Sequence, residues 1–316
     1  MKLVFLDRQT LAPSVNLRRP AFDHDWQEHA ETAPEQVVAR LQQAEVAIVN
    51  KVNIGAGELA QLPGLKLIAL AATGSDNVDL DACRAAGVAV CNIRNYSEST
   101  VPEHALSLIM ALSRNLHAYR RSVTDGRWQQ AGQFCYFDYP VRDLKGQTLG
   151  LIGYGTIARD LERLAKALGM HVIVAARKGQ AAEQGRLPFE QVLAEADVLS
   201  LHCPLTEATR HLISERELAM MKPNALLINV GRGGLVDEQA LLNALKEQRI
   251  GGAGFDVVSA EPPPADHPLM QALQYPNFIL TPHIAWASQA SMQRLADQLI
   301  DNIEAFVAGR EQNRLV

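Results

Sequence analysis

The sequence predicts an α/β protein whose sheets are parallel and doubly wound. Short apolar runs alternate with longer amphipathic stretches from one end of the chain to the other. Most of these runs are apolar on both faces and lack the polar alternation of a half-exposed strand, which is typical of parallel strands covered by helices on both sides. One run also leads into a glycine-rich turn that opens a helical stretch, as expected for a strand followed by a crossover helix.

The expected strands fall into two sets along the chain. The first set comprises Leu3–Leu6, Val46–Val49, Leu67–Ala71 and Val88–Cys91. The second set comprises Thr148–Ile152, Val172–Ala175, Val198–Leu201, Ala225–Val230, Ala253–Val257 and Phe278–Thr281. Because helical patterns separate the strands within each set, we expect two doubly wound domains, each with its own parallel sheet.

A long helix is expected between the two sets, opening near Thr100. Thr100 and Glu103 stand at the spacing of a capping box, and Pro102 falls in the first turn. A helical stripe follows, formed by Leu106, Ile109, Leu112 and Leu116. The last helix should stop near Gly309 and bury one face, formed by Met292, Leu295, Leu299 and Ile303.

Composition and charge argue against several classes of function. The 316 residues carry a net charge of -5 with scattered basic residues, which disfavours nucleic acid or an anionic membrane as the main partner. No stretch approaches the roughly 18 uncharged apolar residues that span a bilayer. The cysteines show no CxxC pair and no zinc spacing, so no metal site is expected. Reduced thiols fit a cytoplasmic protein.

The turn Gly153-Tyr154-Gly155 is a candidate dinucleotide site. It follows an apolar run, and a helical pattern comes after it. The first glycine permits a tight turn, the second lets the backbone approach a pyrophosphate, and the helix start offers free N–H groups. Ala158 takes the third small position, and a second strand ends about 20 residues on. An ordinary turn between a strand and a helix is the alternative interpretation.

Two cations follow the strand Val172–Ala175, where an acidic residue is usual in NAD-preferring sites. An acid there accepts hydrogen bonds from the adenosine ribose hydroxyls and would repel a 2′-phosphate. This chain has Ala176 at that place, followed by Arg177 and Lys178, which would attract such a phosphate. The sequence therefore favours NADP(H). NAD is the alternative, with the two cations forming only a solvated part of the loop.

Three short segments near the end of the chain carry a family resemblance. They are Asn229–Asp237, Gly254–Pro262 and Thr281–Ala285. Within them Arg232, Glu261 and His283 each follow an expected strand, and open α/β sheets bind ligands at strand ends. A phosphate-cradling turn followed by Arg, Glu and His in that order resembles the D-isomer-specific 2-hydroxyacid dehydrogenases. Singly, the three could be a surface turn, a solvated loop and a core histidine.

The resemblance implies a Rossmann nucleotide-binding domain, residues 100–286, inserted into a flavodoxin-like substrate domain of residues 1–99 and 287–316. It also implies reversible hydride transfer between NAD(P)(H) and carbon 2 of a 2-oxo acid. Arg232 would grip the substrate carboxylate and carbonyl oxygens. His283 would exchange the proton, and Glu261 would stabilise its imidazolium and orient its ring.

The resemblance further implies two sets of ligand contacts. The cofactor would contact Val101, Gly153, Tyr154, Gly155, Thr156, Ile157, Ala176, Arg177, Lys178, His202, Cys203, Pro204, Thr209, Val230, Gly231 and Asp256. The substrate would contact Val52, Thr73, Gly74, Arg232, His283 and Trp286. Cys203 is expected to line the cofactor site rather than act as a nucleophile. Trp286 either closes the pocket over a small substrate or packs the hinge between the domains.

Within the family, the chain is most similar to the branch of glycerate dehydrogenases and glyoxylate/hydroxypyruvate reductases. The segments that indicate it are Asn50–Val52, Ala72–Asn77 and Thr281–Ser288. Hydroxypyruvate and glyoxylate are the expected substrates, and a homodimer is the expected assembly. The alternatives are a dehydrogenase of another preference, for phosphoglycerate or larger 2-oxo acids, and a non-catalytic NAD(P)(H)-sensing protein on the same fold. Glu261 disfavours a formate dehydrogenase.

Overall fold

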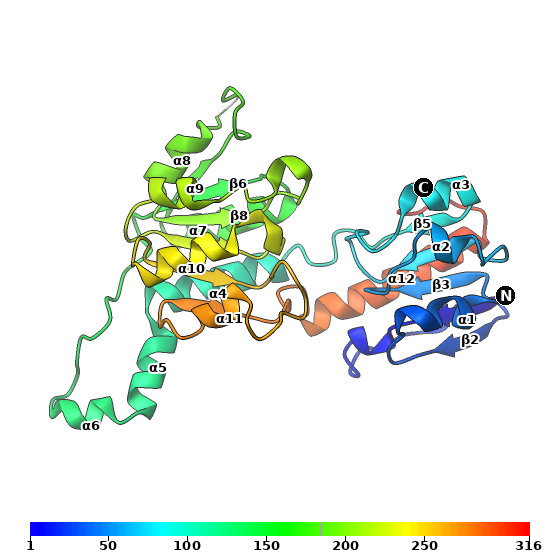
Figure 1. Cartoon of the computed structure of the whole chain (residues 1–316), viewed down its shortest axis with the longest axis horizontal. Helices are drawn as coiled ribbons and strands as arrows, with labels where there is room; N and C mark the ends of the chain where they lie inside the picture. The colour runs from blue at the N-terminus through cyan, green and yellow to red at the C-terminus, as the bar shows by residue number, and fades with distance from the viewer. Residues whose placement is uncertain (184) are drawn as a thin grey trace. The chain divides into compact units, whose positions relative to one another are not determined.

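The computed structural model describes residues 1–183 and 185–316. The chain divides into two compact units (Figure 1): unit 1 contains residues 1–97 and 287–316, and unit 2 contains residues 98–286. Each unit holds one parallel sheet with helices, so the predicted fold class is confirmed. No helix in the described part of the chain is long and apolar enough to cross a membrane.

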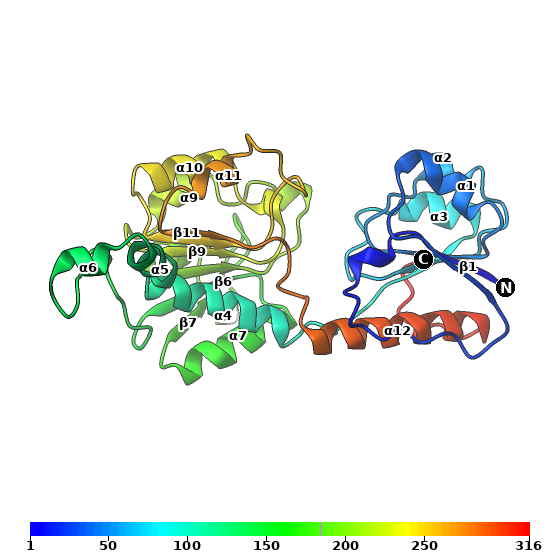
Figure 2. The same ribbon diagram turned by 90° about the horizontal axis from the view of Figure 1, so that it is seen from below.

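The sheet of unit 1 has five strands in the order β2-β1-β3-β4-β5, and every neighbouring pair is parallel. The strands are β1 (Lys2–Phe5), β2 (Asp25–Glu28), β3 (Val46–Val49), β4 (Leu67–Leu70) and β5 (Ala89–Cys91). One face carries the helices α1 (Val37–Leu41), α2 (Ala56–Leu59) and α3 (Leu80–Ala86), and the other carries α12 (Gln289–Val307), as Figure 2 shows. This is the strand order of flavodoxin-like sheets.

β2 has no counterpart among the expected strands. It lies at the edge of the sheet and pairs only with β1, and its sequence, Asp-Trp-Gln-Glu, is largely exposed. An edge strand has a single hydrogen-bonded neighbour and solvent on its other side, so it needs no apolar run. The prediction missed β2 because it identified strands only as apolar runs, and β2 is not one.

The sheet of unit 2 has six strands in the order β11-β10-β9-β8-β6-β7, again all parallel. The strands are β6 (Thr148–Ile152), β7 (His171–Val174), β8 (Val198–Leu201), β9 (Leu226–Asn229), β10 (Gly252–Phe255) and β11 (Phe278–Leu280). Two helices pack on one face, α4 (Thr100–Ser113) and α7 (Thr156–Ala167). Four pack on the other: α8 (Phe189–Glu195), α9 (Glu215–Met220), α10 (Glu238–Lys246) and α11 (Pro268–Ala272). Figure 2 shows the last three of them on that face.

Helix α4 begins where predicted, but two details of the prediction were wrong. Thr100 does not cap the helix, because it is already helical and its Oγ1 donates to the Ala285 carbonyl at 3.2 Å. The helix ends at Ser113, so Leu116 lies in the next helix and is exposed. Ile109 and Leu112 of the expected stripe do pack on the sheet, and Leu106 is partly buried against it. The rest of that face is formed by Val101, Ala105 and Leu108.

The chain leaves the sheet of unit 2 after α4 and forms two more helices. These are α5 (Leu116–Thr124) and α6 (Arg127–Ala131), which project from the body of the unit (Figure 1). Asn115 starts this departure in a left-handed conformation with φ 49°. Elsewhere in the two units the chain forms short 3-10 helices, at Arg8–Thr10, Pro34–Gln36, Glu207–Thr209 and Gly233–Leu235.

The prediction for the last helix is confirmed. α12 packs on the sheet of unit 1 through buried side chains that include Met292, Leu295, Leu299 and Ile303. It ends two residues before Gly309, whose φ of 71° permits the left-handed turn that follows the helix.

Candidate active site

The candidate residues of unit 2 follow successive strands at one edge of its sheet. Parallel strands all end at the same edge, and open α/β sheets bind ligands there. In the order of the sheet, β7 leads to Ala176, β6 to Gly153 and β8 to His202. The neighbouring strands β9, β10 and β11 then lead to Arg232, Glu261 and His283.

Glu261 and His283 are in direct contact. The Nδ1 atom of His283 lies 2.6 Å from Oε2 of Glu261, and both side chains are partly exposed, 28% for His283 and 34% for Glu261. A carboxylate accepts a hydrogen bond, so Nδ1 carries the proton in this contact. The other ring nitrogen, Nε2, is then the one that can exchange a proton with a ligand.

The backbone of His283 is held in an unusual conformation. Its φ is 54°, in the left-handed region that few residues other than glycine adopt. The N–H of His283 donates to the Asp256 carbonyl at 2.8 Å, and the indole N–H of Trp286 donates to the His283 carbonyl at 3.0 Å. Trp286 therefore has a role that neither expectation foresaw, because it holds the segment that carries His283.

Asp256 holds the same segment through hydrogen bonds to its side chain. Its side chain is buried, and its carboxylate accepts hydrogen bonds from the N–H groups of Ile284 at 2.9 Å and Ala285 at 2.8 Å. The hydroxyl of Thr281 donates to the same carboxylate at 2.5 Å. Asp256 was expected to contact the cofactor; what the structure shows is that it orders the turn around His283.

Arg232 lies on a turn that is ordered by a residue absent from the predicted site. Asn229 closes β9 and is fully buried; its Oδ1 accepts the Gly231 N–H at 3.1 Å, and its Nδ2 donates to the Arg232 carbonyl at 2.8 Å. The guanidinium of Arg232 donates to the Gly231 carbonyl at 2.9 Å. A polar residue at the end of an apolar run was the available signal for Asn229.

The glycine-rich turn after β6 fits a dinucleotide. Gly153 has φ 85°, and a Cβ there would lie 2.6 Å from the Cys203 N atom, so only glycine is tolerated. Gly155 differs, because a Cβ there would meet no protein atom within 4 Å. Packing within the protein thus does not require glycine at that place, whereas a pyrophosphate approaching the backbone would. Helix α7 starts at the next residue, Thr156.

The two cations after β7 have different surroundings. Ala176 is buried, and Arg177 is exposed with no side-chain partner among residues 1–183 and 185–316. Lys178 forms an ion pair with the buried Glu217 at 2.9 Å, and its ammonium lies 5.7 Å from the centre of the Phe189 ring. Arg177 is therefore the more available of the two for an anionic ligand.

The segment after β8 carries groups that are neutral at pH 7. Burial lowers the pKa of His202 to about 4, and its Nε2 lies 2.8 Å from the Ser200 hydroxyl. Burial also raises the pKa of the Cys203 thiol, which keeps it protonated and hence a poor nucleophile. Thr209 shapes this loop by donating to the Pro204 carbonyl at 2.7 Å.

The other candidate cofactor residues surround the glycine-rich turn or the start of α4. Val101 and Val230 are almost completely buried. Tyr154 donates its hydroxyl to Glu162, and this bond raises the pKa of Tyr154. Thr156 and Ile157 form the first turn of α7, where the N–H groups of a helix are free to bind an anion.

The candidate substrate residues of unit 1 lie on loops that follow β3 and β4. Asn77 donates to the Val52 carbonyl at 2.7 Å, and the Thr73 hydroxyl donates to the Ile93 carbonyl at 2.6 Å. The buried carboxylate of Asp7 accepts hydrogen bonds from the N–H groups of the β3 loop, those of Asn50, Lys51 and Val52. Asp7 is not among the residues predicted for the site. Gly74 lies next to Thr73 on the β4 loop.

Comparison with known proteins gives four likenesses beyond the geometry. Residues 106–285 match the family model described as D-isomer specific 2-hydroxyacid dehydrogenase, NAD binding domain. The chain is 52% identical over 313 residues to a glycerate dehydrogenase of Methylorubrum extorquens, which covers 99% of this chain and 98% of that protein. It is 32% identical to a hydroxypyruvate reductase of Blautia hydrogenotrophica, with 99% of both chains covered. A solved acyclic imino acid reductase in complex with NADPH and D-Arg aligns over 100% of both chains with a TM-score of 0.84 and 27% identity.

Proposed function

The chain belongs to the D-isomer-specific 2-hydroxyacid dehydrogenases, and we propose that it reduces hydroxypyruvate and glyoxylate to D-glycerate and glycolate, with NADPH preferred. The observation that carries the reaction is the 2.6 Å contact between His283 and Glu261 at the ends of neighbouring strands. The full-length likeness to a glycerate dehydrogenase and a hydroxypyruvate reductase supports the substrate class.

The cofactor, when bound, supplies the hydride for carbon 2 of the substrate. The turn Gly153–Gly155 and the start of α7 would hold its pyrophosphate through backbone N–H groups. The protein has three further tasks: to hold the substrate carboxylate, to polarise the carbonyl group and to deliver a proton.

Arg232 suits the first two tasks. Its guanidinium presents parallel N–H donors that match a carboxylate, and it stays charged at any pH of interest. The buried side chain of Asn229 orders the turn on which it stands. Little conformational freedom of that turn then has to be lost when the substrate binds.

His283 suits the third task. In reduction, Nε2 of the protonated ring donates to the carbonyl oxygen as negative charge develops there. Glu261 faces Nδ1 and so stabilises the positive charge of the ring and holds its orientation. In the direction of oxidation the neutral ring accepts the proton at the same atom.

The preference for NADPH rests on the end of β7. No acidic residue follows the strand, where one would accept bonds from the ribose hydroxyls and repel a phosphate. Arg177 is exposed and lacks a side-chain partner in the described part of the chain, so it can turn towards a 2′-phosphate without breaking an ion pair. Lys178 is held by Glu217 and contributes less.

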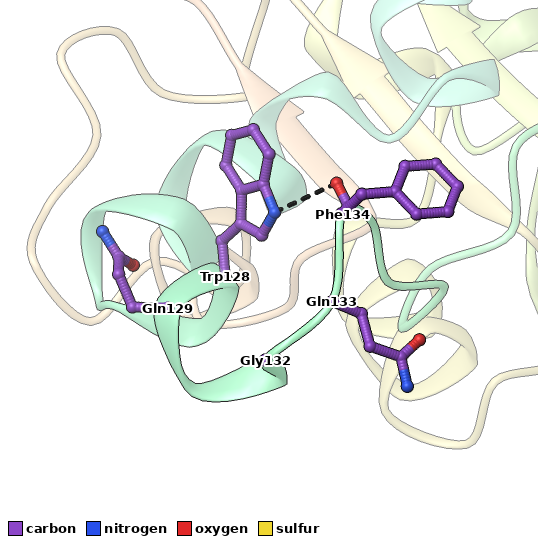
Figure 3. Close-up of a pocket in the computed structure, with 5 residues that line it drawn as sticks. All are labelled: Trp128, Gln129, Gly132, Gln133 and Phe134. Atoms are coloured by element: carbon purple, nitrogen blue, oxygen red, sulfur yellow. Dashed lines mark hydrogen bonds between the residues drawn. The ribbon is translucent and has the colours of Figure 1, made fainter.

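A second copy of the chain is the partner that we propose for α5, α6 and the following segment. Phe134 and Phe137 are 89% and 86% exposed, and Trp128 is 48% exposed. Figure 3 shows a pocket that Trp128 and Phe134 help to line, in which the Trp128 indole donates to the Phe134 carbonyl at 3.2 Å and the Phe134 ring points away from the indole. Exposed aromatic side chains of this kind are typical of the buried centres of interfaces.

The first prediction concerns the acid–base pair. His283→Ala and Arg232→Ala should each lower kcat/KM for hydroxypyruvate by about a hundredfold or more, the scale of positioned proton donors and electrostatic groups. NADPH should still bind, as measured by quenching of protein fluorescence. His171→Ala, at the exposed opposite edge of the same sheet, is the control.

Glu261→Gln tests the partner of His283. In this variant the rate of reduction should start to fall with rising pH at a lower pH than in the parent protein. Near-normal turnover in His283→Ala would contradict the assignment, as would an unchanged pH profile in Glu261→Gln.

The second prediction concerns the substrate. Hydroxypyruvate should be the best of a panel, glyoxylate should follow, and phenylpyruvate should have a kcat/KM lower by about tenfold or more. All three share the carboxylate that Arg232 would grip, so the substituent on the carbonyl carbon makes the difference: hydroxymethyl, hydrogen or benzyl. Steady-state rates with NADPH measure this, and chiral chromatography identifies the product of hydroxypyruvate. Faster turnover of phenylpyruvate, or formation of L-glycerate, would refute the proposed specificity.

The third prediction concerns the cofactor. Arg177→Ala should raise the KM for NADPH by about tenfold, because it removes a charge-assisted hydrogen bond, and should leave the KM for NADH unchanged. Lys178→Ala should have a smaller effect, since Glu217 already holds that ammonium. Replacing both cations and introducing Ala176→Asp should shift the preference to NADH. If the parent protein has equal KM values for the two cofactors, and Arg177→Ala changes neither, the preference for NADPH is wrong.

The fourth prediction concerns assembly. Light scattering should give twice the mass of the chain for the parent protein and the mass of one chain for a variant with both Phe134→Asp and Phe137→Asp. The control is Leu168→Asp, which places a carboxylate on another exposed apolar residue of unit 2 and should leave the mass unchanged. A monomeric parent, or a double variant that keeps the parent's mass, would rule out this surface as the interface.

A further inference from the structure

A buried cluster of three polar side chains lies outside the residues assigned above. Glu238 opens α10 and is almost inaccessible; its carboxylate accepts the Ser259 N–H at 2.7 Å and also the Ser259 hydroxyl. His267 is equally buried, and its Nε2 lies 3.0 Å from the same carboxylate and 3.2 Å from the Ser259 hydroxyl oxygen. We call Glu238, Ser259 and His267 the Glu238 cluster.

The hydrogen bonds of His267 define its form in this cluster. Its Nδ1 accepts the Leu269 N–H at 3.2 Å at the start of α11, so Nδ1 carries no proton. Nε2 therefore carries the proton and donates to Glu238. Ser259 donates its hydroxyl to the carboxylate of Glu238, and neither nitrogen of His267 is left to accept that proton. Ser259 and His267 therefore do not form a nucleophile with its base. The cluster holds the loops that carry its three residues and is not a second catalytic site.

The cluster joins the two loops that carry the proposed catalytic residues. Glu238 follows the segment that begins with Arg232 and Gly233, whereas Ser259 lies two residues before Glu261. The two loops are also in close contact, because a Cβ at Gly233 would lie 2.0 Å from the Val258 carbonyl carbon. Glycine is required there by this approach of one backbone to the other.

The position of Glu261 depends on the loop that the cluster holds. Oε1 of Glu261 accepts the Val258 N–H at 3.3 Å, next to Ser259, and Oε2 contacts His283 at 2.6 Å. We propose that the Glu238 cluster is a positioning network that sets Glu261 against His283 and keeps the Arg232 loop in register with both. This proposal rests on the proposed function for the roles of those three residues, but the placement of Glu261 can be measured without turnover.

Three variants probe the network and one controls for lost stability. Ser259→Ala removes the hydroxyl, and Ser259→Thr keeps a hydroxyl at the same place. Glu238→Gln removes the negative charge to which the three donors bind. Asp197→Asn is the matched control, because Asp197 is a carboxylate of the same unit that accepts the Thr148 N–H at 2.8 Å, at the amino ends of β6 and β8. That edge lies opposite the candidate site. The measurements are the melting temperature, kcat, the KM for NADPH, the pH–rate profile and the NMR titration of the His283 ring.

Ser259→Ala and Glu238→Gln should lower kcat by about tenfold, as expected for a misplaced catalytic group, and leave the KM for NADPH unchanged. The pH–rate profile and the His283 titration should both move to lower pH, because Glu261 no longer stays beside the ring. Ser259→Thr should restore the parent behaviour. Asp197→Asn should lower the melting temperature alone.

Two outcomes separate this proposal from the proposed function. If the cluster variants only lower the melting temperature, as Asp197→Asn does, the cluster is structural and the proposal is wrong. If the parent reduces no 2-oxo acid but the His283 titration still moves in Ser259→Ala and returns in Ser259→Thr, the proposed function fails and the positioning network stands.

Discussion

The parallel direction of all six strands in unit 2 is the constraint on which the candidate site depends. Every strand ends at one edge, so residues from distant parts of the chain arrive side by side there. Helices cover both faces of the sheet, which confines the strands to apolar residues and the polar chemistry to the loops at that edge. The proposed division of labour follows the strand order, with the nucleotide at β7, β6 and β8 and the acid–base chemistry at β9, β10 and β11.

Buried polar side chains at the strand ends give these loops a single conformation. Asn229, Asp256 and Asp7 are all nearly inaccessible, and each accepts N–H groups of the loop that it supports. A buried polar group left without its partner costs about 1–3 kcal/mol, so the loop can move only by giving up that stabilisation. The left-handed backbone of His283 is sustained in this way by Asp256 and by the indole of Trp286.

Charge is distributed unequally along the same edge. The glycine-rich turn offers only backbone N–H groups and the start of a helix, whereas the end of β7 carries a cation with no side-chain partner among the described residues. At the other end, the carboxylate of Glu261 is spent on His283, and Glu238 collects three donors within the protein. The proposed phosphate contact is therefore cationic, although the chain as a whole carries a net charge of -5.

The sequence by itself was sufficient for the fold class, for the strands of both sheets apart from β2, and for the family. Buried parallel strands need continuous apolar runs, and a tight turn such as Gly153 needs glycine, so both leave a local signal. The tertiary structure alone decided which polar residues meet. Four features depend on segments that lie apart in the sequence: the edge strand β2, the partner of Thr100, the Lys178–Glu217 ion pair and the Glu238 cluster. A polar side chain has the same local appearance whether it faces solvent or a buried partner, because only the packing of its neighbours determines which of the two it meets.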